Sequence, residues 1–349
     1  MKDLLIVGQG LAGSVLALKA WQRGLEFMVS SDPARPSWTR IAAGLFNPVT
    51  GRRFVKTWMA DTLFEEIYQF YPWAESVLGD GLYHPRPIYR VFTSRQQRLE
   101  FLNKVDQEPM GRFTPQVFEK GYLPETIHHP EGGLFIPGGG WVDLPRFVQE
   151  AAMWLKSHGR ILDHLVTPDE VIWHDDHAVW NGQSWRKVIF AEGARADQNR
   201  LFAHLPFVLT KGEVLTLKVP NLELNGVVSR GKFILPVGND LIKVGSTYSW
   251  DDTDPVPTEE ARKDLVTGFE EICRLPYEIV HHQVGIRPTV KDRRPFIGMH
   301  SEFSSACIFN GLGTKGVSLA PYWADRALDH LFDGKPLDKE VDIRRFGEN

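Results

Sequence analysis

A glycine pattern near the start of the chain most constrains what it can fold into. Residues 4–7 are apolar and precede Gly8, Gly10 and Gly13, after which apolar positions recur at helical spacing as far as Arg23. A short, branched apolar run is typical of a buried parallel strand. A second such run covers residues 26–30. Strand, glycine turn, helix and strand in this order predict a βαβ unit that begins at residue 3.

The glycines of this unit suit the phosphates of a dinucleotide. Gly8 permits a tight turn, Gly10 lets the backbone approach a pyrophosphate, and Gly13 lets the helix pack closely on the strand. The free N–H groups at the start of the helix and the helix dipole then face the anion. We therefore predict that a dinucleotide cofactor is bound by Gly8, Gly10, Leu11, Ala12 and Gly13. The alternative is a glycine-rich turn that binds no ligand.

The next element of such a unit is normally an acidic residue at the end of the second strand, which binds the ribose hydroxyls. Ser31 occupies that register here, and Asp32 follows one residue late. Two arrangements stay open: Asp32 reaches the ribose from a shifted loop, or Ser31 binds it together with water.

Charge and cysteine content exclude several classes of protein. The 349 residues include 40 Lys and Arg against 44 Asp and Glu, a net charge of −4, so nucleic acid is an unlikely general partner. Cys273 and Cys307 exclude a disulfide framework and a four-cysteine zinc site, and we expect both to be buried, in a helix and a strand. The histidine pairs at 128–129 and 281–282 lack metal-ligand spacing, so no metal is expected.

The cysteine content and the apolar stretches of the sequence predict a cytoplasmic protein. Few cysteines fit a reducing compartment. The apolar stretch at residues 4–18 is interrupted by glycines and is not a signal peptide, so we expect the mature chain to start near Met1. No run approaches the roughly 20 apolar residues that would span a bilayer.

Two kinds of secondary-structure pattern alternate along the chain: helices with buried strands, and short strands typical of an antiparallel sheet. Helices are predicted over 58–71, 144–157, within 255–275, and over 316–331, and buried strands over 185–190 and 306–310. Short runs separated by turn residues between 205 and 250 indicate an antiparallel sheet.

We predict an α/β fold with an α+β second domain. A Rossmann-like domain with helices on both faces of its sheet (1–78, 133–204 and 284–349) would be interleaved with an antiparallel-sheet substrate domain (79–132 and 205–283).

Later segments resemble a known family. They are TRIAAGLFNP at 39–48, FILP at 233–236, VGST at 244–247, GIRPT at 285–289 with Asp292 and PFIG at 295–298, and NGLGTKG at 310–316 with LAP at 319–321. In this order they resemble the D-amino-acid oxidase and glycine oxidase family of flavoproteins, over nearly the whole chain. The resemblance implies that the dinucleotide is FAD. It also implies noncovalent binding, because no cysteine stands where some members attach their flavin.

The resemblance also implies further cofactor-binding residues. The segment after the second strand would wrap the pyrophosphate, the middle of the chain would add two contacts, and the C-terminal glycine loop would meet the flavin. The residues are Thr39, Arg40, Ala43, Gly44, Asn47, Val166, Gly193, Gly311, Gly313, Thr314, Lys315 and Gly316. A glycine loop that opens a helix offers backbone donors and a positive dipole end to the reduced flavin, whose pyrimidine edge is negative. Lys315 would add charge there, or would be a solvated side chain.

Arg287 is the candidate substrate anchor. A guanidinium matches a carboxylate through two parallel hydrogen bonds, and the resemblance implies that Arg287 holds the substrate carboxylate above the flavin. Gly285 and Pro288 predict a turn at this position in place of a strand. The alternative role is a structural ion pair with Asp292. D-amino-acid oxidases carry a tyrosine where this chain has Phe233, so the carboxylate clamp lacks one hydroxyl and a simple D-amino acid is a poor expectation.

Several aromatic residues could line a larger, more apolar pocket, or could pack in the core: Tyr83, Tyr89, Tyr248 and Trp250. The resemblance implies FAD-dependent oxidation of an amine or amino acid, with hydride transfer from the carbon next to nitrogen and oxygen or another molecule as electron acceptor. A flavin-dependent tRNA-modifying enzyme and a nucleotide-binding protein without catalysis are the alternatives.

Overall fold

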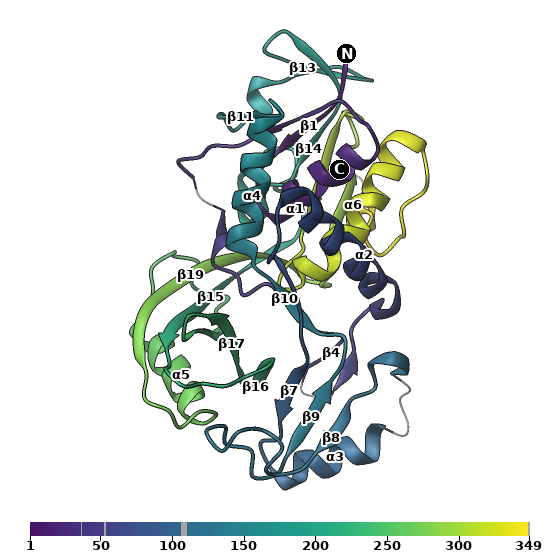
Figure 1. The fold of residues 1–349 in the computed structure, drawn as a ribbon. Coiled ribbons are helices and arrows are strands. Elements are labelled where there is room, and N and C mark those ends of the chain that lie inside the picture. Colours follow the sequence, from purple (N-terminus) through teal and green to yellow (C-terminus); the bar gives the residue numbers. More distant parts are fainter. Residues whose placement is uncertain (36, 52–53, 106–109, 348–349) are drawn as a thin grey trace.

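The computed structural model describes residues 1–35, 37–51, 54–105 and 110–347, which form two main sheets (Figure 1). The strands of the first sheet are β1 (Lys2–Val7), β2 (Phe27–Ser30), β11 (Ile161–Leu162), β12 (Ile172–Trp173), β13 (Ala178–Trp180), β14 (Gln183–Phe190), β20 (Phe296–Met299) and β21 (Ala306–Asn310). Its central strands run in the order β11-β2-β1-β14-β21 and are parallel, while β12, β13 and β20 add antiparallel edges. The α/β prediction is confirmed.

One face of this sheet carries the long helices. Leu4 and Ile6 of β1 are fully buried and pack with α1 (Leu11–Gln22), α2 (Ala60–Leu78), α4 (Leu144–Ser157) and α6 (Gly316–Asp333) in one core. The other face, where Leu5 and Val7 lie, packs with the segments between residues 162 and 207 and with Val290 and Ile343. In the described residues these covering segments are loops and short 3-10 turns, so the expectation of helices on both faces is wrong.

The second sheet is antiparallel apart from one pair. Its order is β19 (Glu278–Val290), β15 (Phe207–Lys218), β18 (Leu241–Gly245), β17 (Lys232–Gly238), β16 (Val227–Arg230), β7 (Ile88–Val91), β9 (Gly133–Ile136) and β8 (Gln116–Phe118). Helix α5 (Glu259–Glu270) packs on one face through Leu265 and Phe269. Phe233 and Leu235, from the opposite face of β17, pack against the core of the first sheet.

The remaining elements are short or lie outside the two main sheets. They are β3 (Leu45–Phe46), β10 (Gly140–Val142) and β6 (Tyr83–Pro85) in one small sheet, the β4 (Val49–Thr50) and β5 (Val55–Lys56) pair, and α3 (Arg95–Val105). The 3-10 turns are η1 (Trp38–Arg40), η2 (Gly111–Phe113), η3 (Pro168–Glu170), η4 (Gly193–Gln198) and η5 (Ile343–Phe346). Helix α3 was not predicted, because it buries only Phe101 and lacks an apolar stripe.

Strand pairing places two segments differently from the proposed domain boundaries. Residues 133–136, assigned above to the Rossmann-like domain, form β9 between β7 and β8 of the second sheet. Residues 284–290 belong to β19, which pairs along its length with β15. The division into two interleaved domains stays a proposal, and these pairings favour moving both segments to the substrate domain.

Local signals explain the best-predicted helix ends. Asp143 caps α4 by accepting a hydrogen bond from the Arg146 N–H, and α4 covers the predicted range. Helix α2 continues past Pro72 to Leu78, because Ala74 and Leu78 keep its apolar face buried.

In the described residues, none of the helices is both long and apolar enough to cross a membrane.

Candidate active site

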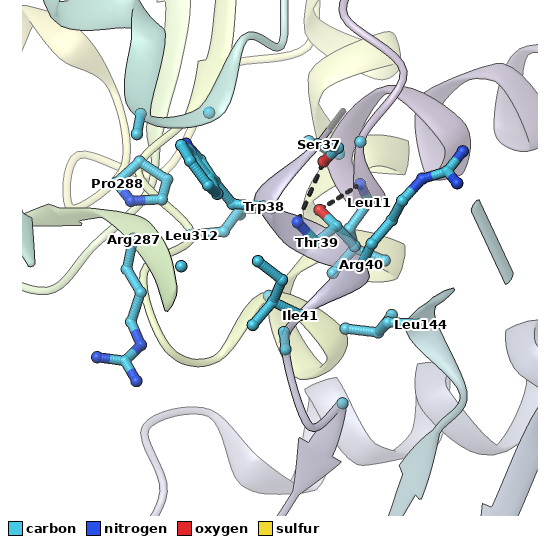
Figure 2. A pocket seen from close by; sticks show the side chains of 18 of the residues that line it. Leu11, Ser37, Trp38, Thr39, Arg40, Ile41, Leu144, Arg287, Pro288 and Leu312 are labelled. Atoms are coloured by element: carbon cyan, nitrogen blue, oxygen red, sulfur yellow. Dashed lines mark hydrogen bonds between the residues drawn. The ribbon is translucent and has the colours of Figure 1, made fainter. Parts of the chain in front are cut away.

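A cavity of about 720 Å³ is lined by residues of both sheets and of the segments between them. Figure 2 shows Arg287 on one side of it and the turn that carries Thr39 and Arg40 on the other. Most of the residues predicted from the sequence line this cavity. They are Gly8, Gly10, Leu11, Ala12, Ser31, Asp32, Thr39, Arg40, Ala43, Gly44, Asn47, Gly193, Arg287, Gly313, Thr314 and Gly316.

The glycine turn meets its neighbours too closely for side chains. Gly8 has φ +107°, and a Cβ there would lie 2.6 Å from the Ala191 carbonyl oxygen. A Cβ on Gly13 would overlap the carbonyl oxygen of Gly8, so Gly13 serves helix–strand packing and does not line the cavity. Gly10, the residue before α1, has no side chain that could cap the helix, and the Leu11 N–H donates to Thr39 Oγ1. The start of α1, where Leu11 and Ala12 line the cavity, would present its remaining backbone donors to a ligand.

The turn at residues 37–44 closes over this helix start. Ser37 Oγ accepts a hydrogen bond from the Thr39 N–H, and Thr39 Oγ1 accepts one from the Leu11 N–H, at 3.1 and 3.2 Å (Figure 2). Lys243 of β18 reaches the same segment, with Nζ 3.4 Å from the Ala42 carbonyl oxygen, and burial lowers the pKa of its amine. Sequence reasoning missed Lys243, which ties the second sheet to this turn.

The two candidates for the ribose contact differ in what they already bind. The Asp32 carboxylate accepts a hydrogen bond from the Ala34 N–H and pairs with Arg35 at 3.0 Å, so it stabilises its own turn. Ser31 lies at the end of β2 and donates its N–H to Leu162. Val166 is fully buried and bonds through its N–H to Ser30 Oγ, outside the cavity lining.

Glu192, which sequence reasoning missed, follows β14 after one intervening residue, Ala191, and lines the cavity beside Gly193. Its Oε2 accepts a hydrogen bond from Asn199 Nδ2 at 2.7 Å. Burial raises the pKa of Glu192 to about 7. An acidic residue two positions after a buried strand was the signal that could have found it. Asn310 Nδ2 fixes the same turn by donating to the Gly193 carbonyl.

Only part of the C-terminal glycine loop, residues 311–316, lines the cavity. Gly313, Thr314 and Gly316 line the cavity, whereas Gly311 and Lys315 do not. Gly311 has φ +72°, and a Cβ there would lie 2.6 Å from Val290 Cγ2. Lys315 is the residue before α6, and burial, with the charges of two neighbouring arginines, lowers the pKa of its amine.

Arg287 lies on strand β19, so the predicted turn is wrong. Pro288 is tolerated there because β19 is the edge strand of its sheet, where a missing N–H breaks no ladder. Nη1 donates to the carbonyls of Lys211 and Thr247, at 3.4 and 3.3 Å. Burial lowers the pKa of the guanidinium. Asp292, the alternative partner, pairs with Arg345 at 2.8 Å.

Aromatic residues divide between the cavity and the core. Phe233 and Tyr248 line the cavity, and Trp250 lies next to Tyr248 at the surface. Tyr83 stacks on Phe46, and Tyr89 packs against Phe118. Phe233 and Tyr248 therefore line the cavity, whereas Tyr83 and Tyr89 pack against the hydrophobic cores.

Both cysteines are buried and lie outside the cavity lining. Cys307 is in β21, where burial raises the pKa of its thiol to about 12. Cys273 lies just beyond the C-terminal end of α5, not inside a helix as expected. Neither thiol is placed to attach a flavin.

The geometry fits FAD. The cavity is lined at the start of α1 by Leu11 and Ala12 and at the start of α6 by Gly316 and Val317, so two helix N-termini border it. A Cβ on Gly10 would lie 2.9 Å from Ser37 Oγ, so a side chain there would crowd the turn at 37–44. Ser31 and Asp32, which follow β2, and Gly313 and Thr314, which precede α6, also line the cavity. A cavity beside the carboxyl ends of these strands suits a dinucleotide.

Comparison with known proteins agrees with this geometry. Over 94% of its length the chain is 24% identical to the tRNA 5-methylaminomethyl-2-thiouridine biosynthesis bifunctional protein MnmC of Marinobacter nauticus, covering 55% of that protein. It is 29% identical over 160 residues to glycine oxidase of Pseudomonas aeruginosa, covering 43% of this chain and 42% of that protein. The chain thus spans about half the length of these curated relatives.

Solved structures show the same fold. Glycine oxidase of Bacillus cereus superposes with a TM-score of 0.80 at 17% identity, over 96% of both chains. L-Proline dehydrogenase of P. horikoshii also gives 0.80, at 16% identity, over 99% of this chain and 98% of that one. The sequence model of the family described as FAD dependent oxidoreductase matches residues 3–329. The chain therefore belongs to this family of FAD-dependent oxidoreductases and has the fold of its solved relatives.

Proposed function

We propose that this protein oxidises the C–N bond of an amine that carries a carboxylate, such as an amino acid or an N-substituted amino acid. The observation that carries the proposal is Arg287, a partly buried guanidinium that lines the cavity. Its hydrogen bonds go to neutral carbonyl oxygens, and no carboxylate of the described residues pairs with it. A cation that loses part of its hydration without gaining an anion is unfavourable, so a substrate carboxylate would complete this site.

The protein's part in this reaction is binding and orientation. The start of α1 and the turn at 37–44 would hold the pyrophosphate, and Gly313 and Thr314 would border the flavin. When bound, FAD would accept the hydride from the carbon next to the substrate nitrogen. Arg287 would fix the carboxylate, and thereby that carbon, at a set distance. Val214, Phe233 and Gly245 line the same part of the cavity and leave it largely apolar, which excludes water and strengthens the ionic contact.

The test is anaerobic bleaching of the bound flavin. Primary and N-substituted amino acids are mixed with the holoenzyme, with the matching 2-hydroxy acids as controls for C–O oxidation. The proposal expects an amino acid to remove the visible absorption while its hydroxy analogue does not. Reduction by hydroxy acids alone would overturn it. Reduction by neither class would favour flavin binding without catalysis, and acceptor assays with oxygen and a dye would separate an oxidase from a dehydrogenase.

A second candidate is a substrate carried on tRNA. The observation that favours it is the similarity to the MnmC proteins, whose name describes tRNA thiouridine biosynthesis. Basic residues line the cavity at Arg35, Arg40, Lys156, Arg195 and Lys232. Two of them are neutralised, Arg35 by Asp32 and Lys232 by Asp264. Gel-shift titration with tRNA at several salt concentrations tests it, because phosphate contacts give a steep salt dependence.

A further inference from the structure

The segment between β18 and α5, residues 246–258, forms one side of the cavity next to Arg287. Ser246 and Tyr248 line the cavity from this segment. The Tyr248 ring lies against the guanidinium, with the Arg287 Cζ 4.6 Å from the ring centroid. Trp250 stacks next to Tyr248, with centroids 6.2 Å apart and an interplanar angle of 26°. The guanidinium of Arg287, the Tyr248 ring and the Trp250 ring thus follow one another as a column, which begins at the group that would bind the substrate carboxylate.

Both rings are unusually accessible. Tyr248 is 53% exposed and Trp250 is 62% exposed. Large aromatic side chains normally bury most of their surface, and adjacent exposed rings beside a cavity indicate a contact surface for a ligand. The column therefore offers an apolar, planar face at the place where a bound carboxylate would end and the rest of the substrate would begin.

The segment is held in place by buried charges. Lys211 of β15 is 2% exposed, and its Nζ lies 2.6 Å from Asp252 Oδ2. The backbones of Lys211 and Ser249 exchange two hydrogen bonds, at 2.9 and 3.1 Å. These contacts fix the residues on either side of Trp250 to the strand that runs under Arg287.

A second anchor holds the far end of the segment. Glu213, 3% exposed, accepts hydrogen bonds at 2.9 Å from both the N–H and the hydroxyl of Thr258, the capping residue of α5. Burying a lysine and a glutamate is unfavourable unless each is paired. Lys211 and Glu213 both bond to this segment, although Glu213 also contacts His282 of β19, with Oε2 2.8 Å from Nε2. The backbone on either side of the rings is thus tied to β15 before any ligand arrives, which lowers the entropic cost of binding.

We propose that Tyr248 and Trp250 form a subsite for a planar aromatic group of the substrate, so that the preferred substrate is an aromatic amino acid or an amino acid with an aromatic N-substituent. This inference rests on the function proposed above, because it places the aromatic group relative to a carboxylate on Arg287. A substrate as small as glycine would leave both rings unused. Stacking adds to the gain from apolar burial, so we expect the protein to select an aromatic over an aliphatic substrate by roughly tenfold or more.

The test compares anaerobic flavin reduction by N-benzylglycine and N-methylglycine, and by phenylalanine and alanine in both configurations. The measured quantity is the ratio of kcat/KM for the aromatic substrate to that for the aliphatic one. Wild type should give a ratio of about ten or more. Trp250→Ala and Tyr248→Ala should lower the ratio towards one, and Trp250→Phe and Tyr248→Phe should retain most of it. A wild-type ratio near one, or a ratio that Trp250→Ala does not change, would overturn the subsite.

Two controls separate the possible failures. Tyr122 is another exposed tyrosine, stacked on Phe118 but outside the cavity lining, so Tyr122→Ala should leave the ratio unchanged. Binding without turnover is measured by the change that 3-phenylpropionate or propionate causes in the flavin absorption spectrum. If no amine reduces the flavin but Trp250→Ala weakens phenylpropionate selectively, the oxidation proposal fails and the subsite stands. If amines reduce the flavin without aromatic preference, the subsite fails and the oxidation proposal stands.

Discussion

Gly212 lies directly beneath the guanidinium of Arg287, and a Cβ at position 212 would overlap that group. The two residues come from paired strands, where Gly212 faces Gly285 and Arg287 faces Thr210. The missing side chain lets Arg287 lie across β15 and reach the carbonyls of Lys211 and Thr247. An isolated glycine in a strand often marks a close approach of this kind.

Gly212→Ala should therefore displace Arg287 and leave the cofactor site intact. We expect kcat/KM for an amino acid to fall about tenfold or more, as for the loss of a charge-assisted hydrogen bond. Gly285→Ala is the matched comparison, because its new Cβ would meet nothing closer than 3.7 Å and should cost much less. Equal rates in Gly212→Ala and wild type would show that Arg287 does not need this space.

Gly10→Asp should abolish FAD retention. The new carboxylate would lie at the start of α1, where the helix dipole and free N–H groups would otherwise meet the pyrophosphate. Gly10→Asn adds nearly the same bulk without the charge and should lose less flavin. The ratio of visible to 280 nm absorbance of the purified proteins measures this. A fully yellow Gly10→Asp protein would place the pyrophosphate elsewhere.

The flavin should be released on denaturation. Both thiols are buried, and neither lines the cavity. Acid precipitation should leave a colourless pellet and a yellow supernatant with the chromatographic retention of free FAD. Mass spectrometry of the whole chain provides the control, since an adduct of flavin mass would contradict the prediction.

Glu192 should make stability depend on pH. Its folded pKa of about 7 lies above the ordinary glutamate value of 4.5, so between these values the folded state binds more protons than the unfolded state. Stability due to Glu192 therefore falls as pH rises through this window, by about 1.4 kcal/mol for each pKa unit. The neighbouring groups that act on it are Asn199, Arg195 and Asp197.

The measurement is the thermal unfolding midpoint of wild type and Glu192→Gln between pH 5 and 8. Glu192→Gln stays neutral at every pH, so wild type should lose stability relative to this variant as pH rises. A constant difference between the two proteins would mean that Glu192 is ionised throughout.

The sequence predicted the elements whose signals are local. The ranges 144–157 and 306–310 coincide with α4 and β21, because a capping aspartate and a continuous apolar run mark them. The resemblance to a flavoprotein family is confirmed, since its motifs extend over most of the chain. Most of the candidate residues line one cavity because the glycine motifs constrain the backbone wherever they occur.

The rest depended on pairing between distant segments. Nothing local to Arg287 shows that β15 runs beside it for the length of β19, so Gly285 and Pro288 favoured a turn. The raised pKa of Glu192 likewise arises from burial among segments far apart in the chain. Lys211 and Glu213 look like ordinary surface residues of a strand, and only the path of the segment at 246–258 buries them.

The central claim is that Arg287 binds the carboxylate of an amine that reduces the flavin. The most direct measurement is the anaerobic rate of flavin reduction by an amino acid and by its decarboxylated amine, in wild type and Arg287→Met. We predict that wild type prefers the acid by roughly ten- to hundredfold, the value of a charge-assisted hydrogen bond, and that Arg287→Met loses this preference with its FAD still bound. The same preference in both proteins would contradict the account and leave Arg287 a structural residue.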